Sequence, residues 1–247
     1  SANVPVPDFT KALTGNVKGL KIGLPKEFNI KGMDPEVQSR IDEATTVFQR
    51  MGAELKEISL PTSQYGVATY HIVAPAEASS NLARYDGVRY GYRTDEKGEL
   101  IKTYRQTRAE GFGTEGKRRI MIGTYVLSSG YYDSFYQKAL KVRALIREDF
   151  NQAFQDVDII LSATAPTAAF KIGERLGDPL AMYLSDIFTI PCNMAGLPGI
   201  SIPCGFTSAG LPVGLQILGQ TFEEEIVLRA SDAYLRETNF HRMHPDL

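Results

Sequence analysis

Cysteine and histidine are scarce in this chain of 247 residues, and tryptophan is absent. Cys192 and Cys204 both lie in an apolar stretch that we expect to be buried, so we predict free core thiols. A disulfide between them is open but not indicated. Free thiols indicate a reducing compartment, the cytoplasm or an organelle matrix or stroma. His71, His241 and His244 are too scattered for a metal site, and the cysteines lack CxxC spacing, which argues against a zinc protein.

The chain also lacks a strong charge bias and an unbroken apolar run. Its formal net charge of −2 argues against a broad surface for nucleic acid or anionic membrane. A membrane helix needs ~18–20 apolar residues without breakers. The most apolar stretch, 186–219, is interrupted at Pro191, Gly196, Pro198, Gly199, Pro203 and Gly205. No signal-peptide pattern opens the sequence, and we interpret Ser1 as a cut boundary.

The stretch 186–219 is the most informative part of what is present. Two apolar runs, 199–206 and 213–219, are bounded by Leu-Pro-Gly and Gly-Leu-Pro, which predicts two buried strands at the centre of a sheet. Glycine inside a core costs backbone entropy, so these glycines predict the close approach of another backbone or of a ligand. Asn193, Gln216 and Asp186 are the main polar exceptions.

The rest of the chain alternates strand and helix signals. An apolar strand at 20–24 is followed by a helix that starts at Asp34-Pro35-Glu36 and ends at Gly52, and then by an alternating strand at 53–60. Strand, helix and strand in this order predict a parallel βαβ unit. Further helices are expected at 65–84, 115–128, 131–155 and 223–238, and a further strand at 157–161. We predict a single α/β domain over 1–247, with a mixed sheet flanked by helices.

Five segments, in order, resemble the amidase-signature family. They are LKIGLPKEF (20–28), 76–93, 107–143, APTAAFKIGE (165–174) and 178–219. Within them, ARYDGVRYGYR (83–93) and EGFGTEGKRRIM (110–121) are similar to the A subunits of glutamyl-tRNA(Gln) amidotransferases. The resemblance implies the C-terminal portion of the amidase-signature fold, without the N-terminal catalytic half.

The family's chemistry, as the resemblance implies it, uses two serines and a lysine to attack the glutamine amide and form an acyl-enzyme. A serine hydroxyl needs a nearby base for this reaction. No matching Gly/Ser-rich loop or lysine segment occurs here, and Ser79-Ser80 and Ser128-Ser129 are expected to cap or pack helices. We therefore expect no catalytic residue in this chain and no glutaminase activity from it alone.

The resemblance also implies a substrate-binding wall. It places the arginine that grips the α-carboxylate of glutamine at Arg119, the aspartate that grips the α-ammonium at Asp186, and a tyrosine of the pocket at Tyr70. A guanidinium binds a carboxylate through two hydrogen bonds, and a carboxylate suits an ammonium. From the residues alone, Arg118-Arg119 could be an ordinary solvated or ion-paired couple, and Asp186 a helix cap. The choice between Arg118 and Arg119 stays open.

The resemblance implies no metal, no cofactor and no membrane contact. It implies glutamine as ligand and the B and C subunits as partners, with tRNA bound mainly through the partner subunit. The arginines and tyrosines of 84–93 could contact RNA by stacking, but we expect a packed and partly exposed helix-loop edge; they are Arg84, Tyr85, Arg89, Tyr90, Tyr92 and Arg93.

Two alternatives remain beside this interpretation. The chain could be a non-catalytic module that binds a partner, or part of another amidase-signature hydrolase, although an apolar amide would need neither Arg119 nor Asp186. In the family the sheet is shared between both halves. We therefore expect uncovered strand edges and self-association of the isolated chain.

Overall fold

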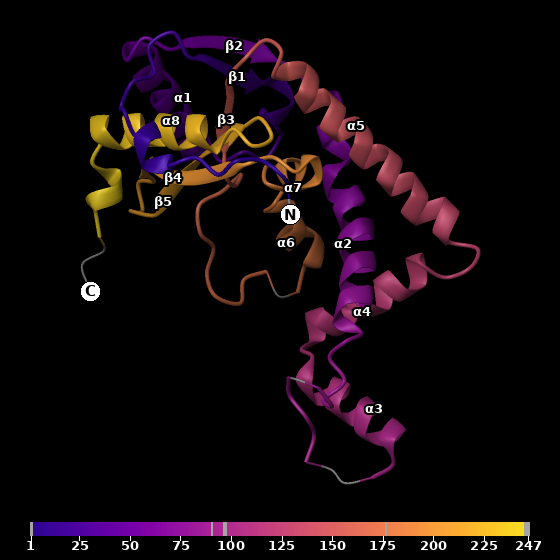
Figure 1. Cartoon of the computed structure of the whole chain (residues 1–247). Helices are drawn as coiled ribbons and strands as arrows, with labels where there is room; N and C mark the ends of the chain where they lie inside the picture. Colours follow the sequence, from indigo (N-terminus) through magenta and orange to yellow (C-terminus); the bar gives the residue numbers. More distant parts are fainter. Residues whose placement is uncertain (1, 90, 96–97, 176, 245–247) are drawn as a thin grey trace. The chain divides into compact units, whose positions relative to one another are not determined.

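The computed structural model describes residues 2–89, 91–95, 98–175 and 177–244 (Figure 1). Ser1 and Tyr90, both named above, lie outside the described residues. The chain divides into two compact units. One, here called the sheet unit, comprises 1–67 and 144–247, and the other, the helical unit, comprises 68–143. The expectation of one domain over 1–247 stays a prediction.

The sheet unit is built on five strands in the order β2-β1-β3-β5-β4. Their bounds are β1 Lys21–Pro25, β2 Glu54–Ile58, β3 Ile159–Ala163, β4 Gly199–Phe206 and β5 Pro212–Gly219. β1 pairs in parallel with β2 and with β3, whereas β5 runs antiparallel to both β3 and β4. The sheet is therefore mixed, and the predicted βαβ unit is confirmed.

Two long helices pack on this sheet and on each other: α1 (Pro35–Arg50) and α8 (Glu224–Glu237). α1 starts where the sequence predicts, because the Asp34 carboxylate accepts the Glu36 amide at 2.8 Å and proline fills the first turn. The rings of Phe48 and Tyr234 stack with centroids 5.4 Å apart and join the two helices. Short 3-10 segments occur at Phe9–Ala12, Lys26–Phe28, Pro61–Tyr65 and Phe240–Arg242.

The position of β4 corrects one expectation. Both glycine-rich runs form strands, but only β5 lies inside the sheet, and β4 is at its edge over the described residues. Pro203 supplies the physical reason, since proline has no N–H to donate and occurs in sheets almost only at edges or bulges. The β4–β5 ladder has an irregularity between Pro203 and Gly205, where the pairing register shifts.

Two short helices inside the apolar stretch were not anticipated, α6 (Pro179–Leu184) and α7 (Ile190–Ala195). The proline at 191 was expected only to interrupt a helix, yet it occupies the first turn of α7, where its missing N–H costs nothing. α7 ends at Gly196, which takes the left-handed conformation (φ 75°) that glycine adopts without strain.

The helical unit contains α3 (Leu100–Gly111), α4 (Thr114–Val126) and the larger part of α2 (Gly66–Leu82). The predicted helix over 131–155 is a π-helical turn, Tyr132–Gln137, followed by α5 (Lys138–Ala153). The boundaries between the two units fall within helices: the chain enters the helical unit within α2 and leaves it within α5.

α3 was missed because its buried positions are threonines. Thr103 and Thr107 are buried, whereas Leu100 and Ile101 are 59% and 64% exposed. An apolar stripe is the main sequence signal of a helix, and this helix has none on its inner side. Over the described residues, no helix is both long and apolar enough to cross a bilayer.

α2 and α4 approach so closely that only glycine fits at position 123. A Cβ added to Gly123 would lie 1.9 Å from the carbonyl oxygen of Pro75 and 2.7 Å from Ser79 Oγ. We expect Gly123→Ala to lower the free energy of unfolding by about 1–3 kcal/mol or more, because the helices must separate. Chemical denaturation followed by circular dichroism measures the change.

Gly116→Ala is the matched control, since a Cβ there meets only the Phe112 side chain, at 3.7 Å and beyond. Replacing that helical glycine should leave stability unchanged or raise it by about 0.5–1 kcal/mol. Equal stability losses in the two variants would refute the close approach of α2 and α4.

Both cysteines are free and buried, as predicted. Burial raises the pKa of the Cys192 thiol to about 11 and that of Cys204 to about 12, from an ordinary value of 9.0. Because the thiolate is the reactive form, we expect the native chain at pH 8 to react with a disulfide reagent at least about 100-fold more slowly than the denatured chain. Rapid labelling of both thiols without denaturant would contradict the buried placement.

The free edge of β4 generates a third prediction. Unpaired strand edges invite pairing with another chain, so we expect concentration-dependent association of the isolated protein. Light scattering across a concentration series measures it. A constant monomer mass at all concentrations would contradict the prediction.

Candidate functional site

Tyr70 and Arg119, two of the three predicted site residues, meet inside the helical unit. Arg119 on α4 donates from Nη1 to the hydroxyl of Tyr70 on α2 at 3.5 Å, and from Nε to Glu115 at 3.1 Å. Burial, the largest single influence, lowers the pKa of Arg119, but the hydrogen bonds and charges of Glu115 and Tyr70 outweigh it and raise the pKa overall. The guanidinium is therefore a partly buried, permanent cation.

Arg118 and Arg119 differ in their surroundings. Arg118 is more exposed, pairs with Glu115 and lies on a different part of α4, beside Lys117 and Met121. Arg119 contacts Tyr70, so two of the three residues that the resemblance singles out belong to one cluster.

Asp186 belongs to the sheet unit, in the turn between α6 and α7. Its backbone carbonyl accepts the amides of Thr189 and Ile190, at 3.1 and 2.9 Å. The side chain is exposed, and its carboxylate has no hydrogen-bond or ion-pair partner within the described part of the chain. Thr189, not Asp186, is the N-cap residue of α7, so the cap interpretation of Asp186 is wrong. The carboxylate is open to a ligand.

Arg175 and Gln216 contact the chain on either side of Asp186, and no sequence motif marked either of them as a site residue. Arg175 lies with its guanidinium over the ring of Phe170, 4.1 Å from the centroid, and donates to Thr167 Oγ1 and Ser185 Oγ. Gln216, noted from the sequence only as a polar exception, is 5% exposed on β5. Its amide donates to Ser162 Oγ at 2.9 Å and to the Phe188 carbonyl at 3.0 Å.

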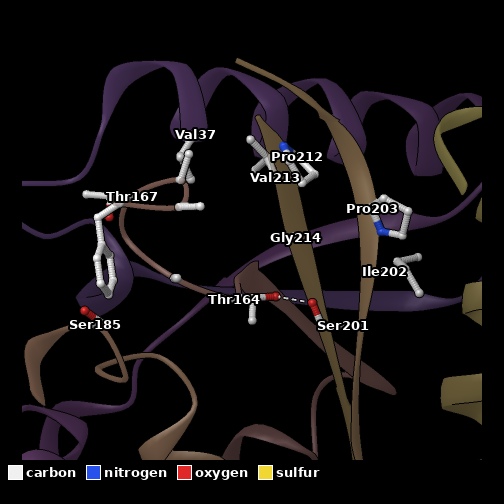
Figure 2. Close-up of a pocket in the computed structure, with 14 residues that line it drawn as sticks. Val37, Thr164, Thr167, Ser185, Ser201, Ile202, Pro203, Pro212, Val213 and Gly214 are labelled. Atoms are coloured by element: carbon white, nitrogen blue, oxygen red, sulfur yellow. Dashed lines mark hydrogen bonds between the residues drawn. The ribbon is translucent and has the colours of Figure 1, made fainter. Parts of the chain in front are cut away.

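A cavity of about 450 Å³ opens in the sheet unit beside this segment (Figure 2). Figure 2 shows the hydroxyls of Thr164 and Ser201 pointing toward one another, joined by a hydrogen bond of 2.6 Å. A Cβ added to Gly214 would lie 2.8 Å from each hydroxyl oxygen, so this glycine makes room for the pair. The sequence predicted that a backbone or a ligand would approach these glycines closely. At Gly214 the close neighbours are the side chains of Thr164 and Ser201. Lining residues are uncharged, and Ser185, the neighbour of Asp186, is one of them.

The paired serines are engaged with the backbone. Ser79 and Ser80 both donate to the carbonyl of Ala76, at 2.9 and 3.3 Å, and Ser128 donates to the carbonyl of Tyr125 at 2.7 Å. Ser79 and Ser80 bond within α2, and Ser128 bonds back to the last turn of α4, which fits the predicted packing or capping role.

The arginines and tyrosines of 84–93 are also partly engaged. Arg84 donates to the carbonyl of Asn81 at 2.9 Å, and the Tyr92 hydroxyl donates to Glu110 at 2.6 Å. Tyr85 packs edge-on against Phe112. α2 ends at Leu82, so the described residues of this stretch form an exposed loop edge, which contacts the neighbouring helices at the places just named. No group of His, Cys, Asp and Glu within the described ranges could hold a metal ion.

Known proteins resemble the chain over nearly its whole length. Residues 1–228 match the amidase family model. The A subunit of glutamyl-tRNA(Gln) amidotransferase from Geotalea daltonii is 60% identical over 242 residues, which cover 98% of this chain and 50% of the relative. Its counterpart from Geobacillus thermodenitrificans is 55% identical over all 247 residues and 51% of its own length. The chain therefore spans about half the length of the curated relatives it matches.

A solved structure gives the same result. The crystal structure of the A subunit of glutamyl-tRNA(Gln) amidotransferase from Thermotoga maritima superposes with a TM-score of 0.71 at 41% identity, over 93% of this chain and 44% of that one. The predicted mixed α/β fold is confirmed. With the family model matched over most of the sequence, the chain belongs to the amidase-signature family, as its motifs indicate.

Proposed function

We propose that this chain supplies the glutamine-binding wall of a glutamine-dependent amidotransferase A subunit, as its C-terminal part. The observation that carries the proposal is the Arg119–Tyr70 pair, a partly buried cation directed at a phenol hydroxyl on the neighbouring helix. In this role Arg119 binds the α-carboxylate of glutamine, Asp186 binds the α-ammonium, and Tyr70 orients Arg119. Identities of 55–60% with A subunits support this assignment.

The proposed role is binding without bond cleavage. The sequence holds no Gly/Ser-rich loop and no segment matching the family's catalytic lysine, so the Ser-Ser-Lys chemistry has to come from outside these 247 residues. Ammonia released from glutamine would serve the amidation of glutamate on tRNA(Gln). The partners in this function are the B and C subunits, with tRNA held mainly by the partner subunit, in the cytoplasm or an organelle matrix or stroma.

The carboxylate grip can be tested by titrating the isotope-labelled chain with glutamine and following amide resonances by NMR. We expect Arg119→Ala to weaken glutamine binding about tenfold or more, since it removes a charge-assisted hydrogen bond worth about 1.5–3 kcal/mol. Arg118→Ala is the matched control, because it removes the neighbouring arginine with the same Glu115 partner. It should change affinity less than about twofold, as expected for an exposed charge.

Two glutamine analogues sharpen the assignment. The wild-type chain should bind glutamine more tightly than the analogue that lacks the α-amino group, and Asp186→Asn should abolish this preference. In the same way, Arg119→Ala should abolish the preference for glutamine over the analogue that lacks the α-carboxylate. Equal losses for Arg118→Ala and Arg119→Ala would contradict the assignment, as would turnover of glutamine by this chain. Binding of a B subunit without any binding of glutamine would favour the alternative, a non-catalytic partner-binding module.

A further inference from the structure

A long irregular segment and the short helix α6 precede the turn that presents Asp186, here defined as residues 185–189. Residues 164–178 connect β3 to α6 without a regular helix or strand among those described. Loops of this length are uncommon in compact domains and are usually functional. The free chain would sample many conformations here, so a fixed Asp186 carboxylate needs anchors on either side of it.

The first anchor is Arg175. Its Nη1 donates to Ser185 Oγ and, at 3.4 Å, to the carbonyl of Ala181, while Nη2 donates to Thr167 Oγ1 at 3.2 Å. The guanidinium also stacks on Phe170. One planar group thereby joins the start of the segment, the helix α6 and the residue directly before Asp186. Lysine could not reproduce this set, because its ammonium is a single point of donation on a flexible stem.

The second anchor is Gln216. Both hydrogens of its buried amide are used, one on Ser162 of β3 and one on the carbonyl of Phe188, two residues after Asp186. Phe188 is itself 1% exposed, and its ring packs on Phe28 at 5.3 Å. Loss of the amide would leave the Phe188 carbonyl buried without this donor, which is unfavourable.

From these contacts we infer that Arg175 and Gln216 are positioning residues, which bracket Asp186 at 185 and 188 and fix its carboxylate for the ammonium of the ligand. The inference rests on the proposed function. Neither residue is assigned a contact with glutamine. Both act on binding through the turn that carries Asp186, so their loss should reduce affinity although the Asp186 carboxylate itself is unchanged.

The experiment uses the labelled full chain without ligand and then with glutamine. In Arg175→Ala we expect the amide resonances of residues 185–189 to shift and broaden before any glutamine is added, and glutamine affinity to fall about tenfold, as misplaced binding groups do. Arg175→Lys should restore neither property. Gln216→Met, which keeps the length of the side chain but not its donors, should act in the same direction.

Arg236→Ala is the matched control for a general loss of stability. Arg236 makes two hydrogen bonds in the same unit, one to Asp232 Oδ1 and one to the carbonyl of Leu13, and an ion pair to Asp232 Oδ2, all at 3.0 Å. This variant should leave the resonances of residues 185–189 and the glutamine affinity unchanged. Equal effects of Arg236→Ala and Arg175→Ala would overturn the inference.

Two further outcomes separate the inference from the proposed function. Unchanged resonances of residues 185–189 in Arg175→Ala overturn the positioning role, whether or not glutamine binds. Shifted resonances with undiminished affinity overturn it as well, provided that Asp186→Asn weakens binding. If Asp186→Asn has no effect on glutamine, the proposed function fails, and the resonances alone decide whether Arg175 and Gln216 hold the turn.

Discussion

The antiparallel pairing of β3 with β5 is the constraint on which the sheet unit depends. It joins the parallel strands β1, β2 and β3 to the β4–β5 pair, with Ile159 opposite Gly219 and Ala163 opposite Leu215. Both strands are almost wholly buried, so their register is fixed by the core on both faces. The same pairing brings Ser162 opposite Gln216 and so sets up the polar contact that reaches the Asp186 turn.

Much of the architecture follows from local sequence signals, and the exceptions have physical causes. The βαβ unit, α8 and the inner strand β5 were predictable because apolar periodicity and caps agree there. α3 was not, because threonines form its buried side, and α6 and α7 were hidden by prolines that start helices as well as end them. The edge position of β4 could have been read from Pro203.

The candidate site was predictable only in part, for a different reason. Tyr70, Arg119 and Asp186 came from a resemblance of motifs, and no local pattern marks them. Arg175 and Gln216 carry even less signal, because their importance lies in contacts with Ser185 and Phe188. Such contacts depend on tertiary placement, which a single sequence does not encode in its local preferences.

The irregularity in β4 limits which strands could be added beside it. Between Pro203 and Gly205 the phase of the side chains changes relative to β5, and at Pro203 the outer rim lacks a donor. A regular strand laid along this rim could match the segment before the irregularity or the one after it, but not both. A strand that pairs along the whole of β4 would need its own irregularity opposite Pro203 and Gly205. The backbone of β4 therefore selects which strands can pair with this edge of the sheet.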